Sequence, residues 1–318
     1  MKAIQVLNAK TKAKLVQVPM VKIKGNEVLV KTLFTPIHPT DLEIEKLKYP
    51  WTLGLEGSGV IIEAKNQDLI GKRCAFYKYN GTFAEYVIPT NYFLLPDDLS
   101  SEDASLMNII PVSALALYKL TLGQRFILSG ANSSLGQLLL TLTKNQKPIC
   151  IVRNQEGRQK LMIQGVSHVI DFTRGSFYEY LNLCVKDYPV FIGFDLVAGK
   201  MTSTLLGLLG DGGVLYQVGN LSKKAIESVD YQDLIHRNKS LKGFNFLNYE
   251  GKIEEFYKEI LNEPFMFRSK IVKTLKFEDF GQGFIEYNQN MRAGKILLNF
   301  NDVGCNNNLQ ISERILKK

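Results

Sequence analysis

The stretch Ser129-Gly130-Ala131-Asn132-Ser133-Ser134-Leu135-Gly136-Gln137 decides the fold of this chain. It follows an apolar run, Phe126-Ile127-Leu128, and opens a helical pattern that starts at Leu138. A second apolar run, Ile149-Cys150-Ile151-Val152, comes next and ends in Arg153. A strand, a tight Gly/Ser turn, a helix and a second strand are the front half of a dinucleotide-binding βαβ unit.

The turn and Arg153 predict the ligand. Small residues let main-chain N–H groups approach a pyrophosphate, and the helix N-terminus adds a partial positive charge. A carboxylate after the second strand would bond a ribose 2′-hydroxyl, whereas Arg153 neutralises a 2′-phosphate. We therefore predict NADPH before NADH; a surface salt bridge is the alternative role of Arg153. The predicted cofactor-binding residues are Gly130, Asn132, Ser133, Ser134, Leu135, Gly136, Arg153, Gly199 and Gly219.

Three more apolar runs follow the first two. They span 168–171, 190–197 and 213–219, and helical patterns separate them. Continuous apolar strands that alternate with helices predict a parallel sheet covered on both faces. Gly199 and Gly219 come just after strand ends, where ligands approach such a sheet. An ordinary strand-turn-helix in an α/β core is the alternative reading of the turn.

Bulk composition bounds the class of protein. The chain has 318 residues, 45% hydrophobic and 22% charged, which suits two soluble globular domains. Its formal charge of +8 favours phosphorylated ligands, acidic proteins or anionic membranes. The lysines are scattered and not interleaved with aromatic residues, so we expect no nucleic-acid binding. No apolar run is long enough to span a bilayer. The four cysteines form no CxxC pair and are expected to be reduced, mostly buried thiols.

The parts of the chain differ in pattern. Residues 1–110 carry short strands with Gly/Pro/Asn turns, typical of a small β-barrel-like domain. Residues 111–250 are the predicted dinucleotide-binding domain, and 251–300 return to the first domain. A polar tail, 301–318, ends the chain.

This order of parts resembles the medium-chain dehydrogenase/reductase superfamily over roughly residues 1–300. The resemblance implies a GroES-like β-barrel substrate domain plus a Rossmann doubly wound parallel sheet. The matching segments are Pro39-Thr40-Asp41, Gly54-Leu55-Glu56-Gly57-Ser58-Gly59-Val60, Gly71-Lys72-Arg73, Gly81-Thr82-Phe83-Ala84-Glu85-Tyr86 and Leu95-Pro96.

Within the superfamily the chain is most similar to the zinc-free branch of quinone oxidoreductases and mitochondrial 2-enoyl thioester reductases. The second subgroup is favoured by segments 132–137, 152–153, 197–200 and 241–244. The resemblance implies NADPH as hydride donor and an enoyl thioester or a quinone as acceptor. It also implies a homodimer and a mitochondrial location, with the cytoplasm as the alternative.

Zinc is not expected. Zinc-dependent relatives need an early Cys, a Gly-His-Glu and a further Cys; here His38 and Leu55 stand at the first two positions. One ligand cannot make a site that needs three from the protein. His38 is therefore expected to be a hydrogen-bonded core or cleft residue, and Glu56 to hold the cleft wall by hydrogen bonds.

Reduction of a C=C bond conjugated to a carbonyl needs a hydrogen bond to the oxygen and a proton at the α-carbon. The resemblance offers Tyr49 for this catalytic role; packing beside Pro50 and Trp51 is the alternative. Asn245 is a departure, because many thioester reductases carry Trp after the Leu-x-Gly-Phe motif.

Two functions remain open on the sequence. The first is an NADPH-dependent enoyl-thioester or quinone reductase. The second is a weak or inactive reductase-like accessory subunit of a larger complex, such as a mitochondrial respiratory complex, whose basic surface meets an acidic partner or an anionic membrane. The serine-substituted turn, the short Tyr49 loop and the polar tail motivate the second.

Overall fold

The computed structural model describes residues 1–8, 12–43, 49–186, 188–291 and 293–301, in two compact units. Unit 1 comprises Met1–Asn108 and Ser269–Lys318, and unit 2 comprises Ile109–Arg268. The predicted return at residue 251 is therefore too early. Helix α8 (Ile253–Asn262) belongs to unit 2, because its apolar face is buried there and contacts α2 (Ile109–Leu120). Most of the predicted tail, from residue 302, lies outside the described residues.

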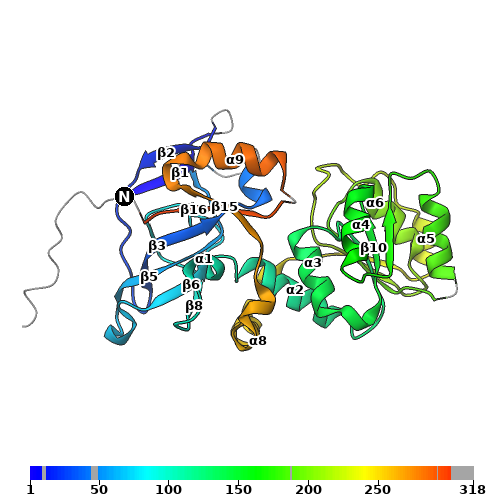
Figure 1. Cartoon of the computed structure of the whole chain (residues 1–318), viewed down its shortest axis with the longest axis horizontal. Coiled ribbons are helices and arrows are strands. Elements are labelled where there is room, and N and C mark those ends of the chain that lie inside the picture. The colour runs from blue at the N-terminus through cyan, green and yellow to red at the C-terminus, as the bar shows by residue number, and fades with distance from the viewer. Residues whose placement is uncertain (9–11, 44–48, 187, 292, 302–318) are drawn as a thin grey trace, which may run out of the picture. The chain divides into compact units, whose positions relative to one another are not determined.

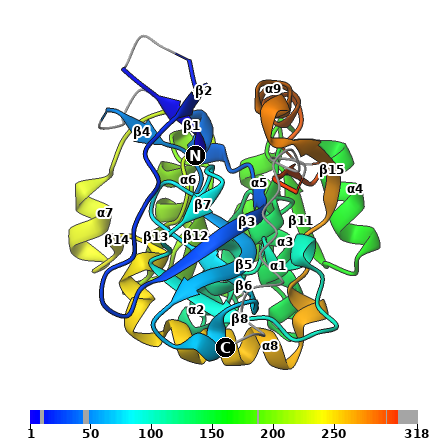
Figure 2. The ribbon, with the colours of Figure 1, turned by 90° about the vertical axis from the view of Figure 1, so that its left-hand side faces the viewer.

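Unit 1 is built mainly of antiparallel strands (Figures 1 and 2). A seven-stranded sheet has the order β15-β16-β3-β5-β6-β8, with β7 on β3, and a three-stranded sheet has the order β2-β1-β4. Ala3 of the smaller sheet also forms an isolated antiparallel bridge with Ala84, which lies outside the named strands. The strands are β1 (Lys2–Val6), β2 (Lys14–Gln17), β3 (Val28–Pro36), β4 (Trp51–Thr52), β5 (Glu56–Ala64), β6 (Arg73–Tyr77), β7 (Tyr86–Val87), β8 (Asn91–Leu94), β15 (Ile271–Lys276) and β16 (Lys295–Asn299).

Short helices complete unit 1. They are η1 (Pro39–Leu42), α1 (Ser101–Ala104) and α9 (Phe280–Gln289). Helix α1 begins as the sequence predicts, because the Ser100 side chain accepts a hydrogen bond from the Asp103 amide. Strand β5 carries glycine where β3 passes closest, since a side chain at Gly59 would collide with the Lys31 carbonyl. These contacts explain why this strand carries glycine at that point.

Unit 2 is a six-stranded parallel sheet of order β11-β10-β9-β12-β13-β14. The chain runs outward from β9 to β11 and then returns beside β9, so the order reverses between β9 and β12. The strands are β9 (Ile127–Ser129), β10 (Ile149–Val152), β11 (His168–Asp171), β12 (Ile192–Asp195), β13 (Val214–Gln217) and β14 (Ser240–Gly243). The intervening helices are α3 (Ser134–Leu142), α4 (Gln155–Ile163), α5 (Phe177–Lys186), α6 (Lys200–Leu208) and α7 (Tyr231–His236).

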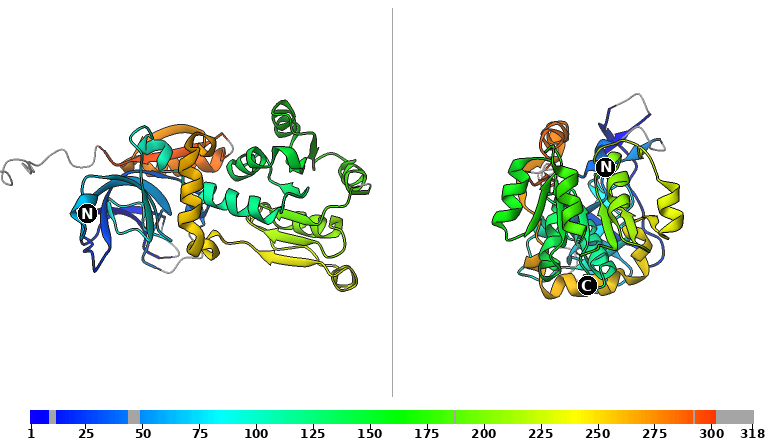
Figure 3. Two further views of the ribbon diagram at one scale, coloured as in Figure 1. Left: turned by 90° about the horizontal axis from the view of Figure 1, so that it is seen from below. Right: turned by 90° about the vertical axis from the view of Figure 1, so that its right-hand side faces the viewer.

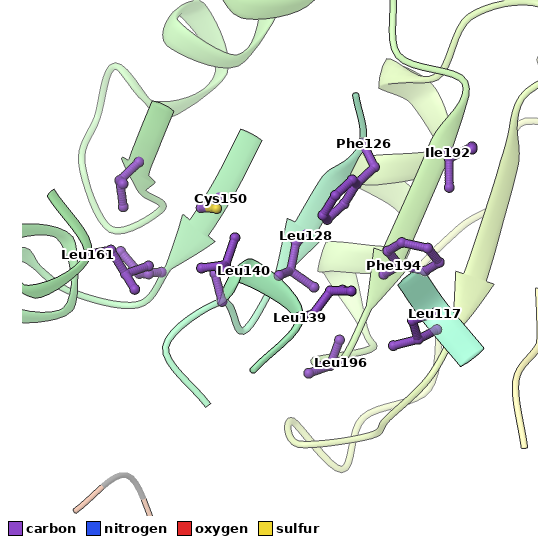
Figure 4. Close-up of a cluster of buried hydrophobic side chains, with 13 residues drawn as sticks. Leu117, Phe126, Leu128, Leu139, Leu140, Cys150, Leu161, Ile192, Phe194 and Leu196 are labelled. Carbon is purple, nitrogen blue, oxygen red and sulfur yellow. The ribbon is translucent and has the colours of Figure 1, made fainter. Parts of the chain in front are cut away.

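Helices cover both faces of this sheet (Figure 3). Alternate strand residues divide into two buried clusters, so Leu128 and Cys150 point to one face while Ile127 and Ile149 point to the other. The first face packs against α2, α3 and α4, and Figure 4 shows Leu139 of α3 between Leu128 and Leu196. The second face packs against α5 and α6. The predicted fold class, a β-rich domain plus a doubly wound parallel sheet, is confirmed.

Candidate functional site

The predicted phosphate turn lies at the carboxyl end of β9, beside the point where strand order reverses. Ser133 is the N-cap of α3, and its hydroxyl accepts a hydrogen bond from the Gly136 amide at 3.1 Å. The Ser133 amide donates to the Gly130 carbonyl at 2.9 Å, which closes the turn. The first-turn amides of a helix have no intrahelical carbonyl to bond; the Ser133 hydroxyl takes that of Gly136, which leaves those of Ser134 and Leu135 as donors for an anion.

Backbone geometry explains both glycines of the turn. Gly130 has φ of +63°, a left-handed conformation that costs other residues energy. A Cβ at Gly136 would lie 2.6 Å from the Ala131 carbonyl oxygen, which is a backbone contact that no side-chain movement relieves. The serines at 133 and 134 therefore stand where no glycine is required. The backbone conformation of the turn is therefore compatible with a bound diphosphate.

A second helix N-terminus lies against this turn. Asn154 caps α4 by accepting the Gly157 amide at 2.9 Å. A Cβ at Gly157 would lie 2.7 Å from Nδ2 of Asn132, so the two turns are in close contact. Arg153 stands between β10 and this cap, and its side chain is exposed. Its guanidinium is therefore accessible to a charged ligand at this edge of the sheet.

Gly199 and Gly219 complete the set of predicted cofactor residues. Gly199 has φ of +67° and precedes α6, at the end of β12. A Cβ at Gly219, after β13, would lie 2.8 Å from the Leu196 carbonyl oxygen. Since β10, β9, β12 and β13 are adjacent and parallel, all nine predicted residues lie along one edge of the sheet. Their contacts with a cofactor stay a prediction.

The same edge carries a hollow that the sequence did not predict. It has a volume of about 550 Å³ and lies at the ends of β13 and β14. The rings of Tyr216, Phe244 and Tyr249 line it, with the amide side chains of Asn245 and Asn248. Phe244 and Tyr249 have ring centroids 5.7 Å apart. Burial raises the pKa of Tyr249, and the neighbouring Tyr216 raises it further. Asn245 fills less of this space than Trp would.

Unit 1 holds a buried polar cluster. Nε2 of His38 lies 2.8 Å from Oε1 of Glu56, whose Oε2 accepts the Asn108 amide at 3.0 Å. Both side chains are buried, so the predicted core role of His38 and the hydrogen-bonding role of Glu56 are confirmed. Asp41 accepts the backbone amides of His38 at 2.8 Å and Gly54 at 3.0 Å.

Lys295 and Tyr287 complete the cluster, and no sequence pattern predicted either of them. Nζ of Lys295 lies 3.3 Å from Nδ1 of His38 and 3.3 Å from the Tyr287 hydroxyl. An ammonium only donates, so Nδ1 accepts and the Nε2 proton of His38 points at Glu56. Burial lowers the pKa of Lys295 to about 8, against the opposing pull of Glu56 and Asp41. Burial also raises the pKa of Tyr287 and that of Asp41.

The depressed pKa of Lys295 predicts a pH-dependent stability. Between this pKa, about 8, and the ordinary value of 10.5, the unfolded chain holds a proton that folded Lys295 has lost. The contribution of Lys295 to the unfolding free energy is constant below that window and rises within it, by at most about 1.4 kcal/mol per pH unit. We expect urea unfolding to show wild type gaining stability relative to Lys295→Met across this window. Parallel pH profiles of the two proteins would contradict the assignment.

Tyr49 packs against the core of unit 1. It is half-buried and contacts the cluster that contains Ile4, Leu53 and Phe83. This placement agrees with the packing role and leaves the catalytic role a prediction. The preceding residues, 44–48, lie outside the described part of the chain.

Two further basic side chains have defined contacts, and three cysteines have defined burial. Arg158 donates to the Val169 carbonyl at 3.1 Å, and Lys200 lies over the Tyr178 ring. Cys74 and Cys150 are buried free thiols, whereas Cys184 is half-buried. Among the residues that the structure describes, no group of three or more His, Cys, Asp or Glu is placed to hold a metal. No described helix has the length and apolar character to cross a membrane.

Known proteins resemble this chain in sequence and in fold. The alcohol dehydrogenase GroES-like domain family model matches residues 24–97. A mitochondrial enoyl-[acyl-carrier-protein] reductase from Dictyostelium discoideum is 26% identical over 314 residues, with 87% of each chain covered. The Arabidopsis thaliana enzyme of the same name is 26% identical over 267 residues, covering 76% of this chain and 71% of its own.

Solved structures share the architecture. A putative NADPH:quinone reductase from Bacillus thuringiensis has a TM-score of 0.81 and 22% identity, covering 94% of this chain and 98% of its own. The Escherichia coli quinone oxidoreductase complexed with NADPH has a TM-score of 0.81 and 18% identity, covering 94% of this chain and 100% of its own. At these identities the likeness establishes the fold alone.

Proposed function

This chain is a zinc-free member of the medium-chain dehydrogenase/reductase superfamily, and from that premise we propose that it reduces a 2-enoyl thioester with NADPH. The observation that carries the proposal is the glycine-shaped turn on the β9–α3 junction beside the exposed Arg153. The choice of acceptor rests on the curated relatives, which are named enoyl-[acyl-carrier-protein] reductases. The accessory-subunit alternative is not favoured by these relatives.

The residues of unit 2 would hold the cofactor. The first-turn amides of α3 would bind the diphosphate, and the guanidinium of Arg153 would bind the 2′-phosphate. Bound NADPH would supply the hydride for the β-carbon of the acceptor. The Tyr49 hydroxyl would donate a hydrogen bond to the thioester carbonyl, on which negative charge develops, or a proton to the α-carbon.

A quinone is the competing acceptor. Three aromatic rings, of Tyr216, Phe244 and Tyr249, surround the hollow at the ends of β13 and β14. Such rings suit the planar face of a quinone as well as an apolar acyl chain. Assays with both acceptors therefore belong together. We also propose a mitochondrial location, as in the names of the curated relatives, and a homodimer.

Arg153→Ala tests the cofactor. Loss of a charge-assisted contact should raise the Kd for NADPH about ten- to hundred-fold and leave the Kd for NADH nearly unchanged. Fluorescence titration of both cofactors measures the two constants. Arg237→Ala is the matched control, because it removes the same charge from an exposed ion pair with Asp211. Equal losses for both cofactors would remove Arg153 from this role.

Tyr49→Phe separates catalysis from packing. If the hydroxyl acts on the acceptor, kcat should fall about a hundred-fold while the Kd for NADPH and the melting temperature hold. Tyr79→Phe is the control, since Tyr79 is an exposed tyrosine of the same unit, edge-on to Trp51. An unchanged kcat in Tyr49→Phe would leave Tyr49 with packing alone.

A further inference from the structure

Asp195, the last residue of β12, is a fully buried carboxylate surrounded by neutral donors. Its Oδ1 accepts the Ser129 hydroxyl at 2.6 Å, the Val197 amide at 2.8 Å and the Ala198 amide at 3.1 Å. Its Oδ2 accepts the Thr202 hydroxyl at 2.7 Å. An ionised carboxylate only accepts hydrogen bonds, and several donors are what makes a charge tolerable in the interior. Four donors on two oxygens therefore suit the charged form.

These donors belong to different parts of the cofactor edge. Ser129 opens the phosphate turn, and its oxygen also accepts the Leu196 amide at 3.0 Å. Val197 and Ala198 lie in the loop that leads to Gly199, and Thr202 lies in the first turn of α6. One carboxylate thus joins the turn after β9 to the loop after β12.

The loop after β13 is hydrogen-bonded to the main-chain carbonyl of the same residue, Asp195. Nε2 of Gln217 donates to the Asp195 carbonyl at 3.1 Å and to the Gly219 carbonyl at 2.6 Å. Oε1 of Gln217 lies 3.0 Å from the Thr202 hydroxyl. The Asp195 carbonyl also accepts the Val218 and Gly219 amides, at 2.8 and 3.1 Å. All three loops therefore converge on one residue.

The loop after β12 is also strained. Ala198 has φ of +69° and is followed by Gly199 at +67°. Left-handed backbone at a residue other than glycine persists only where its surroundings hold it, and it is common at functional sites. The bond from the Ala198 amide to Asp195 is one such restraint. The carboxylate thus holds a conformation that the loop would otherwise leave.

We propose that Asp195 is a positioning residue: without touching the cofactor, its carboxylate fixes the turn after β9 and the loop after β12, and its main-chain carbonyl the loop after β13, in the arrangement that binds the dinucleotide. The inference rests on the proposed function for its ligand. The positioning role and simple electrostatics predict opposite changes in cofactor affinity when the charge of Asp195 is removed. Removing a negative charge near an anionic cofactor should tighten binding, whereas releasing the turn after β9 and the loop after β12 should weaken it.

Asp195→Asn distinguishes these outcomes. The asparagine keeps the shape, but its neutral Oδ1 is a weaker acceptor for the three donors it faces than a charged carboxylate, so the network loosens. We expect the Kd values for NADPH and NADH to rise together, each about ten- to hundred-fold. This pattern differs from that of Arg153→Ala, which should affect NADPH alone. Unchanged or tighter binding by the folded variant would overturn the proposal.

Asp171→Asn is the matched control. Asp171 is a buried aspartate at the end of β11, and its Oδ1 accepts the amide and hydroxyl of Thr173 at 3.0 and 2.7 Å. The substitution weakens a similar local network at β11, an edge strand of the same sheet. The Kd values for NADPH and NADH should therefore stay at their wild-type values. If Asp195→Asn does not fold, Ser129→Ala removes one donor only and should weaken both cofactors in the same direction. An unchanged affinity in Ser129→Ala would then overturn the proposal.

Hydrogen exchange without cofactor separates this inference from the proposed function. In Asp195→Asn, the amides of Leu196, Val197 and Ala198 should exchange faster than in wild type. The amides of β10 and β11 should keep their wild-type exchange rates. Wild type that binds no NADPH would defeat the proposed function and leave this result readable. Equal exchange in wild type and variant would overturn the positioning role.

Discussion

Gly136→Ala should weaken NADPH binding severely, with a rise in Kd of at least about a hundred-fold. The new Cβ would lie 2.6 Å from the oxygen, 2.8 Å from the carbon and 2.9 Å from the Cα of Ala131. Because these are backbone atoms, the turn itself must move, and the donors that face the diphosphate move with it. Overpacking of this kind also costs about 1–3 kcal/mol of stability. Fluorescence titration and thermal melting measure the two effects.

Gly207→Ala is the control for this substitution. Gly207 lies in α6 of the same unit, and a Cβ there meets nothing within 4 Å. Alanine at an open helical position should keep NADPH affinity and stabilise the protein by about 0.5–1 kcal/mol. If Gly136→Ala bound NADPH as tightly as Gly207→Ala, the turn would not be the diphosphate site.

Glu56→Leu should destabilise unit 1 by about 3–5 kcal/mol. The substitution takes the Glu56 carboxylate from the Nε2 proton of His38 and from the Asn108 amide, and it leaves the buried Lys295 ammonium with the attraction of Asp41 but without that of Glu56. An uncompensated buried charge is among the most costly local changes in a protein. Urea unfolding at neutral pH, followed by a probe in unit 1 such as Trp51, measures the loss.

The double variant Glu56→Leu with Lys295→Met tests the cause. If Lys295 and Glu56 are coupled, the pair should cost clearly less than the sum of the two single changes. Glu278→Gln is the control, since it breaks a partly exposed ion pair with Lys2 and should cost no more than about 1 kcal/mol. Wild-type stability in Glu56→Leu would contradict the coupling.

The cofactor edge was predictable because its signals are local. A turn of small residues between an apolar run and a helical pattern, with Ser133 at the N-cap, is contained in ten residues. Alternation of apolar strands and helices then predicts a parallel sheet, and parallel strands bring their carboxyl ends to one edge. The placement of Arg153, Gly199 and Gly219 beside the turn follows from that geometry.

The unit 1 cluster was not predictable, because its members are far apart in the chain. Lys295 and His38 are 257 positions apart, and Lys295 opens a strand that reads as an ordinary apolar run. Nothing in local sequence marks a lysine as buried, since most lysines are exposed. The boundary at α8 was missed for a related reason: an amphipathic helix shows which face is buried but not which partner covers it.

The most direct test of the account is NADPH oxidation by the purified chain with a 2-enoyl thioester, run beside a quinone and followed by NADPH absorbance. We expect NADPH oxidation with the thioester, a strongly reduced oxidation rate in Gly136→Ala and the wild-type rate in Gly207→Ala. A chain that binds NADPH tightly but oxidises it with neither acceptor would contradict the reductase assignment.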